Sequence, residues 1–419
     1  MTAQPSVLRD LVLSLSAPGH RDEPASDGFT AEDWAQIQTM VRHHRLGALL
    51  HSRISNRRSG VEMPKAFTDE LAASFRKQTL RSLDLQYEIA RIHRILDDEA
   101  ITGVFLKGAF LAFHAYAHPA QRPLRDIDVL VPRARVIDAY EALMRAGYAR
   151  HERYPGDATA AAAFLKHLPP LVSRTSGVCI EVHARLFDLP SGTDVSPMEL
   201  AYDPETWRDL IFREVAGERI AYLSPTRQLL HLIVHAVIDH RLNCGPLVLM
   251  DIAHLLELSQ IDWPQFWRLA ETGGQLRGCW LLLSVAKHFD ESLPIVPPTD
   301  PPPLPTDSME VVTMLMLGDA SSRAELRQHG DVLRTGSVIA GARFLLGKLF
   351  PTRTHLAAIY GESDSEIKIA VAYFAHWWRL TTVRLPQYLA SRYDVPVQQG
   401  ATASARLQQW LADDGRPAV

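Results

Sequence analysis

Two short stretches, GVFLKG (residues 103–108) and RPLRDIDVLV (residues 122–131), decide how this chain is interpreted. The second is apolar and rich in β-branched residues around its acids, which predicts a covered strand. Side chains two positions apart on a strand leave the same face, roughly 7 Å apart, so we expect Asp126 and Asp128 to share a face. Two carboxylates on a covered strand are costly unless a cation compensates their charge. Solvated acids at an exposed strand end are the alternative, and the apolar flanks favour the metal site.

A third acid comes from a second apolar run, VCIEVH (residues 178–183), in which Glu181 and His183 share a face. The pair Ser176-Gly177 is a turn signal, so residues 163–186 are predicted to form a hairpin. If this hairpin lies beside the first strand, three carboxylates converge. Three carboxylates on neighbouring strands can hold two Mg²⁺ ions about 4 Å apart, an arrangement suited to phosphoryl displacement. The chemistry indicated is nucleotidyl transfer.

The stretch around Lys107 and Gly108 predicts an anion site. Residues 104–106 resemble a short strand, and Gly108 opens an apolar helical run over residues 109–116. A glycine at a helix start lets the backbone approach a phosphate, and Lys107 adds a cation there. An ordinary strand-to-helix turn with a solvated lysine is the alternative. Neither a Walker P-loop nor a G-x-G-x-x-G motif occurs.

Taken in order, Leu106-Lys107-Gly108, Arg122-x-x-x-Asp126-x-Asp128 and Glu181-x-His183 resemble the DNA polymerase β-type nucleotidyltransferase superfamily. They resemble more closely its bacterial branch of uncharacterised nucleotidyltransferases, over roughly residues 30–390. The resemblance implies a glycine motif at the triphosphate and an acidic triad that holds Mg²⁺, as two ions, with Mn²⁺ as an alternative. The implied triad of catalytic metal ligands is Asp126, Asp128 and Glu181; the implied nucleotide and phosphate ligands are Lys107, Gly108 and Arg122.

Two matches are looser. The superfamily has Gly-Ser or Gly-Gly where this chain has Lys107-Gly108, and Arg122 is interpreted as either a phosphate contact or a brace of the fold. His231 and His235 have a spacing that could ligate a metal, but such a pair more often serves packing or capping, and no Glu follows His231 as in H-E-x-x-H. In the context of the resemblance, His183, His235, His240 and Asp251 are expected on the substrate side of the cleft.

The predicted fold class is α/β (α+β), with a mixed-sheet nucleotidyltransferase core between large helical regions. Helix-period spacing predicts helices over residues 30–54, 69–98, 134–146, 309–317, 340–350 and 366–382, with one more in the tail from residue 401. The predicted domains are an N-terminal helical region (1–98), the core (99–222), a helical region completing the cleft (223–292), a proline-rich linker (293–308) and a C-terminal helical region (309–419).

Composition is typical of a globular protein, with 419 residues, 47% hydrophobic residues, 22% charged residues and a net charge of −4. No apolar run approaches the ~20 residues of a membrane helix, and the N-terminus lacks the apolar segment of a signal peptide. We therefore expect a cytoplasmic location without membrane contact. The three cysteines, Cys179, Cys244 and Cys279, follow no metal spacing and are expected to be reduced. Lys and Arg are scattered, so no long nucleic acid is expected as a partner.

The sequence thus predicts an Mg²⁺-dependent enzyme that transfers a nucleoside monophosphate from an NTP such as ATP to an unidentified acceptor, with release of pyrophosphate. The acceptor would be a small molecule, an RNA end or a protein side chain. Two alternatives remain open. One is a non-catalytic nucleotide-binding or scaffold protein, and the other is the toxin of a toxin–antitoxin pair with the same chemistry.

Overall fold

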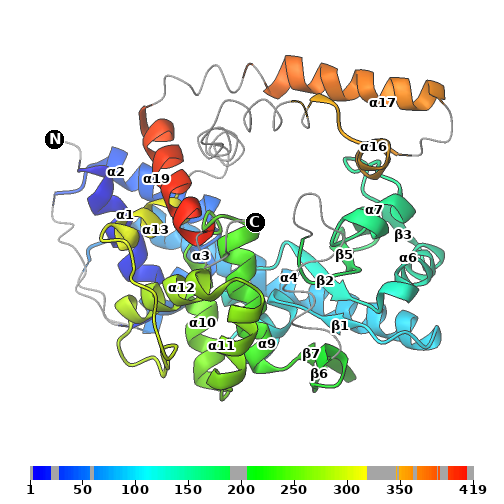
Figure 1. Ribbon diagram of the computed structural model, residues 1–419. Helices are drawn as coiled ribbons and strands as arrows, with labels where there is room; N and C mark the ends of the chain where they lie inside the picture. The colour runs from blue at the N-terminus through cyan, green and yellow to red at the C-terminus, as the bar shows by residue number, and fades with distance from the viewer. Residues whose placement is uncertain are drawn as a thin grey trace. The chain divides into compact units, whose positions relative to one another are not determined.

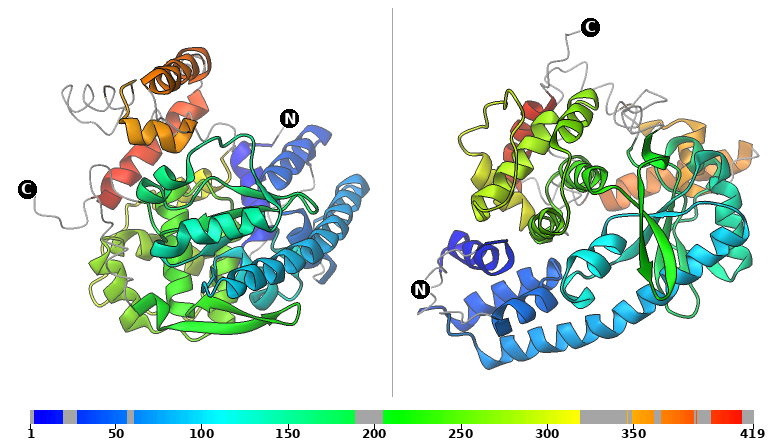
Figure 2. Two further views of the ribbon diagram at one scale, coloured as in Figure 1. Left: turned by 90° about the vertical axis from the view of Figure 1, so that its right-hand side faces the viewer. Right: turned by 90° about the horizontal axis from the view of Figure 1, so that it is seen from below.

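The computed structural model describes residues 3–19, 28–56, 61–188, 205–318, 346, 349–361, 366–384, 386 and 395–412 (Figure 1). The chain divides into two compact units. Unit 1 comprises Met1–Ala90, Phe105–Arg125 and Pro204–Ala320, and unit 2 comprises Arg91–Val104, Asp126–Asp203 and Ser321–Val419. Long helix α4 (Lys65–Asp98), which Figure 2 shows as one continuous rod, runs from the first unit into the second.

Unit 2 contains the strands that carry the acids. Its elements are the end of α4, the start of β1 (Val104–Phe105), β2 (Asp126–Leu130), η3 (Arg133–Arg135), α6 (Val136–Arg145), β3 (Tyr148–Arg150), α7 (Ala158–Phe164), β4 (Leu171–Ser173), β5 (Cys179–His183), α16 (Arg353–Tyr360), α17 (Glu366–Arg379), η6 (Leu380–Arg384) and α19 (Val395–Ala412). The strand order is β3-β4-β5-β2, with β1 next to β2. β2 and β5 are parallel, whereas β3/β4 and β4/β5 are antiparallel, so the sheet is mixed.

One face of the β2–β5 pair is fully buried. Ile127, Val129, Ile180 and Val182 are each at most 1% exposed. Helix α6 packs against β5, and the end of α4 comes close to β2 because Gly103 has no side chain. A Cβ at Gly103 would lie 2.6 Å from Leu96 Cδ1. Strict alternation along a strand then sends the polar residues of both strands to the opposite face.

Unit 1 is mainly helical and adds a two-stranded hairpin. Its elements are α1 (Pro5–Ser16), α2 (Ala31–His43), α3 (Gly47–Asn56), most of α4, α5 (Gly108–Phe110), η1 (Leu111–Ala115), η2 (Pro119–Gln121), η4 (Glu205–Trp207), β6 (Leu210–Val215), β7 (Glu218–Leu223), α9 (Pro225–Val234), η5 (His235–Asp239), α10 (Leu247–Leu258), α11 (Trp263–Thr272), α12 (Leu276–Phe289) and α13 (Ser308–Met316). The turn between β6 and β7 has Ala216 and Gly217 at φ 51° and 83°. Two consecutive positive φ angles define the type I′ turn that matches strand twist.

The predicted α/β class with helical flanks is confirmed. The predicted hairpin of residues 163–186 exists as β4 and β5, and it lies beside β2, the condition under which the sequence places the acids together. The predicted helices correspond to α2 and α3, α4, α6, α13, α17 and the described part of the tail, α19. The helix predicted over residues 340–350 falls largely outside the described residues, as does the tail beyond residue 412.

The proline-rich stretch, predicted as a linker, has no regular secondary structure before α13 begins at Ser308. Leu293 and Ile295 in it are buried, and Trp267 Nε1 donates to the Val296 carbonyl. Within the described part of the chain, no helix has the length and apolar character needed to cross a membrane.

Candidate metal centre

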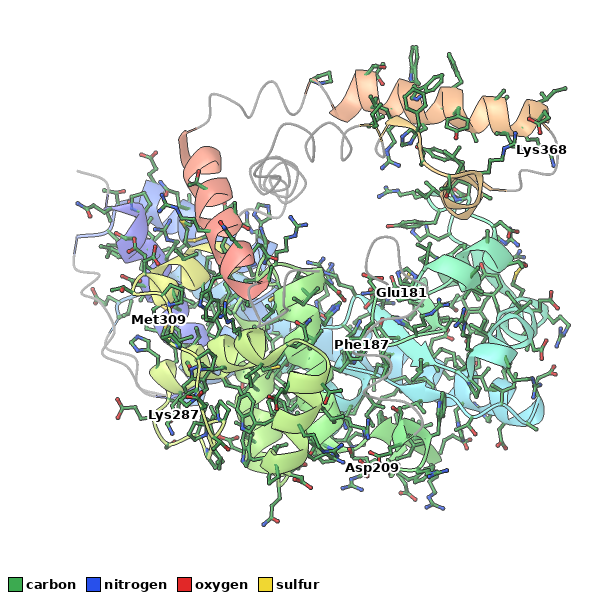
Figure 3. The ribbon with its side chains drawn as sticks, viewed as in Figure 1. Glu181, Phe187, Asp209, Lys287, Met309 and Lys368 are labelled. Atoms are coloured by element: carbon green, nitrogen blue, oxygen red, sulfur yellow. The ribbon has the colours of Figure 1, made fainter. Side chains whose placement is uncertain are left out.

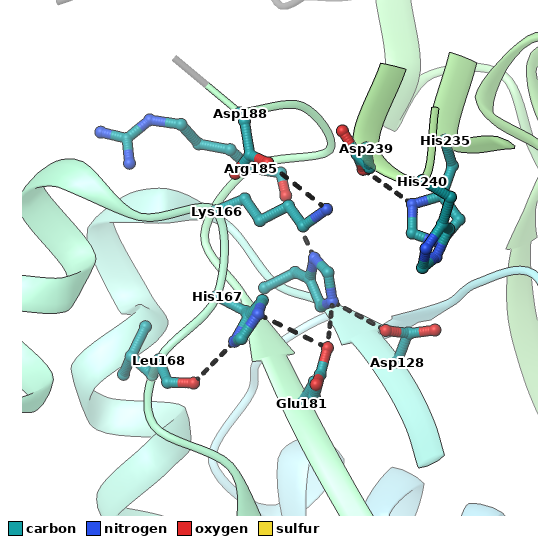
Figure 4. A network of polar contacts seen from close by, with 11 residues as sticks. Asp128, Lys166, His167, Leu168, Glu181, Arg185, Asp188, His235, Asp239 and His240 are labelled. Atoms are coloured by element: carbon teal, nitrogen blue, oxygen red, sulfur yellow. Dashed lines mark hydrogen bonds and ion pairs between the residues drawn. The ribbon is translucent and has the colours of Figure 1, made fainter. Parts of the chain in front are cut away.

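Asp128 and Glu181 are register partners on adjacent parallel strands. In the β2–β5 pair, Asp126 is opposite Cys179, Asp128 is opposite Glu181 and Leu130 is opposite His183. Paired positions of a parallel ladder share a face, so these residues all lie on the face opposite the buried one. Figure 4 shows the carboxylates of Asp128 and Glu181 side by side at this place, and Figure 3 marks Glu181 in the whole molecule.

His183 joins the two acids. Its Nε2 lies 2.9 Å from Asp128 Oδ1 and 3.6 Å from Glu181 Oε2. One ligand atom from each of the three residues lies within 4.8 Å of the others. Asp128 is 6% exposed and His183 is fully buried. The structure therefore brings together two of the predicted ligands and one residue that was expected to face the substrate.

A second histidine, His167, borders Glu181 from the neighbouring segment. Its Nε2 lies 3.6 Å from Glu181 Oε2, and its Nδ1 lies 2.9 Å from the Leu168 carbonyl (Figure 4). Burial raises the pKa of the Glu181 carboxyl, but the hydrogen bond from His183 and the charge of His167 outweigh it and hold this pKa below its ordinary value. Glu181 is thus held in its charged form, the form that ligates a cation.

Cys179 lies among the acids, as its register position requires. Burial, followed by the charges of Asp126 and Glu181, raises the pKa of its thiol to about 12. The thiol therefore stays protonated near neutral pH and is a poor nucleophile or metal ligand. The structure places none of Cys179, Cys244 and Cys279 in a disulfide.

Arg185 fixes the chain segment that follows the site. Its guanidinium is buried and donates to the carbonyls of Ala162, Ala163 and Leu165 at the end of α7, at 3.0–3.1 Å. A cation at a helix C-terminus also interacts favourably with the helix dipole. The Arg185 carbonyl in turn lies 3.3 Å from His183 Nδ1. Helix α7 therefore helps to set the orientation of the His183 ring.

Asp126 lies on the same face, two positions before Asp128 on β2. Among the described residues, the group with mutually close ligand atoms contains Asp128, Glu181 and His183 but not Asp126. The role of Asp126 as a metal ligand and the presence of a second ion stay predictions.

The donor set is suitable for one divalent cation. Two carboxylates and an imidazole supply oxygen and nitrogen ligands of the kinds that Mg²⁺, Mn²⁺ and related ions accept. Without a cation, the two acids place like charges on one partly covered face, which burial penalises. The residues therefore fit a divalent metal ion.

In unit 1, Gly108 opens α5 directly after β1, as predicted. Lys107, which precedes it, has φ 48°, a conformation that is rare for a residue with a side chain. The amides of Ala109 and Phe110 donate to the carbonyls of Leu106 and Lys107, each at 3.1 Å. A Cβ at Gly108 would lie 3.0 Å from Leu124 Cγ, so packing against Leu124 already disfavours a larger residue here. Phosphate binding by Lys107 and Gly108 stays a prediction.

Arg122 and Asp251, predicted as phosphate and substrate contacts, bind each other. Arg122 Nε lies 2.7 Å from Asp251 Oδ1, and Tyr116 donates its hydroxyl to the same oxygen at 2.8 Å. Asp251 is only 1% exposed. This network ties the segment after η1 to helix α10, which supports the brace interpretation of Arg122 and gives Asp251 a structural role.

His235 and His240 form a separate pair in unit 1. His235 Nδ1 lies 2.7 Å from Asp239 Oδ2, and the Nε2 atoms of His235 and His240 lie 2.9 Å apart. These residues come from the π-helical turn η5 and the position directly after it. Their contact with substrate stays a prediction. His231 packs near His235, with ring centroids 6.3 Å apart, as the packing alternative expects.

Sequence reasoning missed three polar residues: His167, Tyr116 and Asp239. His167 could have been found from the hairpin, because His167 and His183 form an antiparallel bridge that continues the β4–β5 pairing. Asp239 could have been found from its spacing of four from His235. No local signal marks Tyr116, because its partner Asp251 is far away in the sequence.

Comparison with known proteins gives one family match. The family model described as "Uncharacterised nucleotidyltransferase" matches residues 30–290, more than half of the chain and a range that includes all three residues of the metal centre. No curated protein and no solved structure matches the chain. On the strength of the family match, the chain belongs to the uncharacterised nucleotidyltransferase family.

Proposed function

We propose that this protein transfers a nucleoside monophosphate from an NTP to an acceptor hydroxyl, with release of pyrophosphate. The observation that carries the proposal is the register pairing of Asp128 with Glu181, with His183 between them, in a chain of a nucleotidyltransferase family. Two close acids on one face of a sheet are costly unless a cation or a substrate compensates them. A metal-bound triphosphate supplies that compensation.

The reaction would use the chain's residues mainly for charge placement and orientation. Asp128 and Glu181 would hold a divalent cation, Mg²⁺ or Mn²⁺, with Asp126 next to them on β2. When bound, such a cation neutralises the triphosphate and favours the deprotonated form of the acceptor hydroxyl. The acceptor oxygen forms its bond to the α-phosphorus as the bond between that phosphorus and the leaving pyrophosphate breaks.

Residues at and around the site would bind the cation, orient its ligands or contact the triphosphate. The low pKa of Glu181 keeps its carboxylate charged at neutral pH, so the ligand needs no deprotonation before it binds. Arg185 and α7 hold the segment after β5 in place. Lys107 and Gly108 would contact the triphosphate, with the helix-start amide favouring negative charge. Fixed ligands of this kind contribute to catalysis through positioning.

The test is a label-transfer assay with two labelled forms of each NTP. The purified chain is incubated with Mg²⁺ or Mn²⁺ and with fractions of small metabolites, RNA or protein as acceptors. Label at the α-phosphorus should move to an acceptor, and label at the γ-phosphorus should leave as pyrophosphate. Movement of the γ-label to an acceptor would replace the proposal by a kinase-type reaction.

The matched control is Asp128→Asn, which keeps the size of the side chain and removes its charge. Transfer of the α-label by wild type and its loss in this variant support the proposal. Equal transfer by both proteins would mean that the activity does not come from this site. Nucleotide binding without transfer to any fraction would favour the non-catalytic nucleotide-binding alternative.

A further inference from the structure

The hydrogen-bond partners of His183 constrain which of its ring nitrogens carries a proton. Nδ1 lies 3.3 Å from the backbone carbonyl of Arg185. A carbonyl oxygen only accepts hydrogen bonds, so Nδ1 must be the donor in this contact. The Arg185 carbonyl is itself held in place, because the Arg185 guanidinium makes three hydrogen bonds to the end of α7.

In the neutral ring, a proton on Nδ1 leaves a lone pair on Nε2. That lone pair is directed at the Asp128 carboxylate, 2.9 Å away, and at Glu181, 3.6 Å away. Carboxylates are also acceptors. Three acceptor atoms, His183 Nε2, Asp128 Oδ1 and Glu181 Oε2, therefore lie close together around the fully buried His183 ring. The arrangement is favourable only with a positive charge among these atoms, supplied either by a second proton on the ring, which lets Nε2 donate to the carboxylates, or by a cation that all three groups bind.

We propose that His183 Nε2 is a direct ligand of the cation held by Asp128 and Glu181, and that this imidazole makes the site select a first-row transition metal over Mg²⁺. This inference rests on the proposed function for the presence of a cation. It goes further by assigning the third ligand and the class of metal.

The arrangement is the one that metal-binding histidines generally adopt. Such a histidine donates its other ring N–H to a carbonyl or carboxylate, which fixes the tautomer and raises the basicity of the ligating nitrogen. The Arg185 carbonyl fills this role for His183. His167 provides the contrast: its Nδ1 contacts a carbonyl and its Nε2 approaches Glu181, but among the described residues it does not belong to the group of close ligand atoms.

The ligand set explains the selectivity. Mg²⁺ prefers oxygen ligands in near-ideal octahedral geometry and keeps several waters. Imidazole nitrogen binds transition metals better, and among these Mn²⁺ also accepts carboxylates readily. A site with one imidazole and two carboxylates should therefore bind Mn²⁺ more tightly than Mg²⁺.

The direct test is pulsed electron paramagnetic resonance of Mn²⁺ added alone to the full chain. A nitrogen bound directly to Mn²⁺ modulates the electron spin echo, and ¹⁵N-labelled histidine should change the pattern. We expect this nitrogen signal in wild type and in His167→Gln, which removes the neighbouring imidazole. We expect its loss in His183→Gln, which replaces the nitrogen ligand by an oxygen.

Binding constants give a second, independent readout. The ratio of the dissociation constants for Mg²⁺ and Mn²⁺ should fall about ten-fold from wild type to His183→Gln. His151→Gln, which changes a histidine elsewhere in unit 2, should leave the ratio unchanged. Bound Mn²⁺ without a nitrogen signal in wild type, or an unchanged ratio in His183→Gln, would overturn the assignment.

These results separate the inference from the proposed function. A nitrogen signal in a protein that transfers no nucleotide supports His183 as a ligand and removes the enzymatic proposal. Nucleotide transfer by a wild-type protein without the nitrogen signal supports the enzymatic proposal and overturns the assignment of His183 as a ligand. Failure of wild type to bind Mn²⁺ at all overturns the ligand assignment. This outcome is read from the wild-type protein alone and does not depend on the folding of a variant.

Discussion

Asp128 on β2 and Glu181 on β5 stand directly opposite each other in a parallel ladder, although 53 positions separate them in the chain. Parallel pairing places both carboxylates on one face, and the other face of the same strands is closed by apolar side chains. The fold thus fixes the separation and direction of the two acids through backbone hydrogen bonds. Positioning of this kind does not depend on a flexible loop.

Removal of either acid's charge should abolish transfer without unfolding the protein. We expect Asp128→Asn and Glu181→Gln each to lower the rate at least about 100-fold, because charge stabilisation at the reacting phosphate is a large part of catalysis. The measurement is α-label transfer, with circular dichroism to check the fold. Glu152→Gln, at an exposed position, is the matched control and should keep full activity.

Asp126→Asn tests the more distant acid separately. A loss comparable to that of Asp128→Asn would support Asp126 as a ligand that engages when metal and nucleotide bind. Near-normal activity in Asp126→Asn would restrict the site to the triad of Asp128, Glu181 and His183.

The buried network of Arg122 and Asp251 should contribute strongly to stability. Asp251→Ala removes the acceptor that Arg122 and Tyr116 share, so we expect a loss of about 3–5 kcal/mol in the free energy of unfolding. Arg122→Met/Asp251→Ala should lose less than the sum of the single changes. Chemical denaturation of the four proteins measures this. Additive losses would show that the pair does not act as a brace.

Gly108 offers a way to separate packing from phosphate binding. A Cβ at position 108 would lie 3.0 Å from Leu124 Cγ, so Gly108→Ala should cost about 1–2 kcal/mol of stability. In a Leu124→Ala background, this cost should disappear. If Gly108 also contacts a phosphate, Gly108→Ala should weaken NTP binding in both backgrounds. Binding that recovers together with stability would limit Gly108 to packing.

His114 should make the protein less stable in mild acid. Burial, followed by the charge of Arg213, lowers the pKa of His114 from its ordinary 6.5 to about 4. Below pH 6.5 the unfolded chain takes up a proton that the folded chain refuses, so stability falls as the pH drops from 6.5 toward 4. Because the side chain is partly exposed, we discount the full shift to about 1 kcal/mol between pH 7 and pH 5. Denaturation curves of wild type and His114→Gln measure it, and curves that stay parallel would contradict it.

The sequence predicted the elements of the core because their signals are local. Alternation around Asp126 and Asp128 and the turn at Ser176-Gly177 determine strands and a hairpin without reference to the rest of the chain. The sequence did not predict that β2 pairs with β5. It gave this neighbourhood only as the condition for bringing the acids together, since no local pattern specifies which strands become neighbours.

The roles of individual polar residues were harder to predict. His183 shares a face with Glu181 in any strand, but its contact with Asp128 depends on the Arg185 carbonyl, which orients the ring, and on the β2 register. Arg122 and Asp251 are 129 positions apart, so their ion pair leaves no trace in either local sequence. Contacts between distant segments are determined by tertiary packing, which a single sequence does not reveal.

The most direct measurement of the central claim is a thermal-shift screen of ATP, GTP, CTP and UTP, each with Mg²⁺, with Mn²⁺ and without metal. It is run on wild type and on Asp128→Asn/Glu181→Gln, since a ligand that binds the folded state raises the melting temperature. We predict a shift that requires a divalent cation, occurs with at least one NTP and is lost in the double variant. A shift of equal size in the double variant, or no shift with any NTP, would contradict a metal-dependent nucleotide site at Asp128 and Glu181.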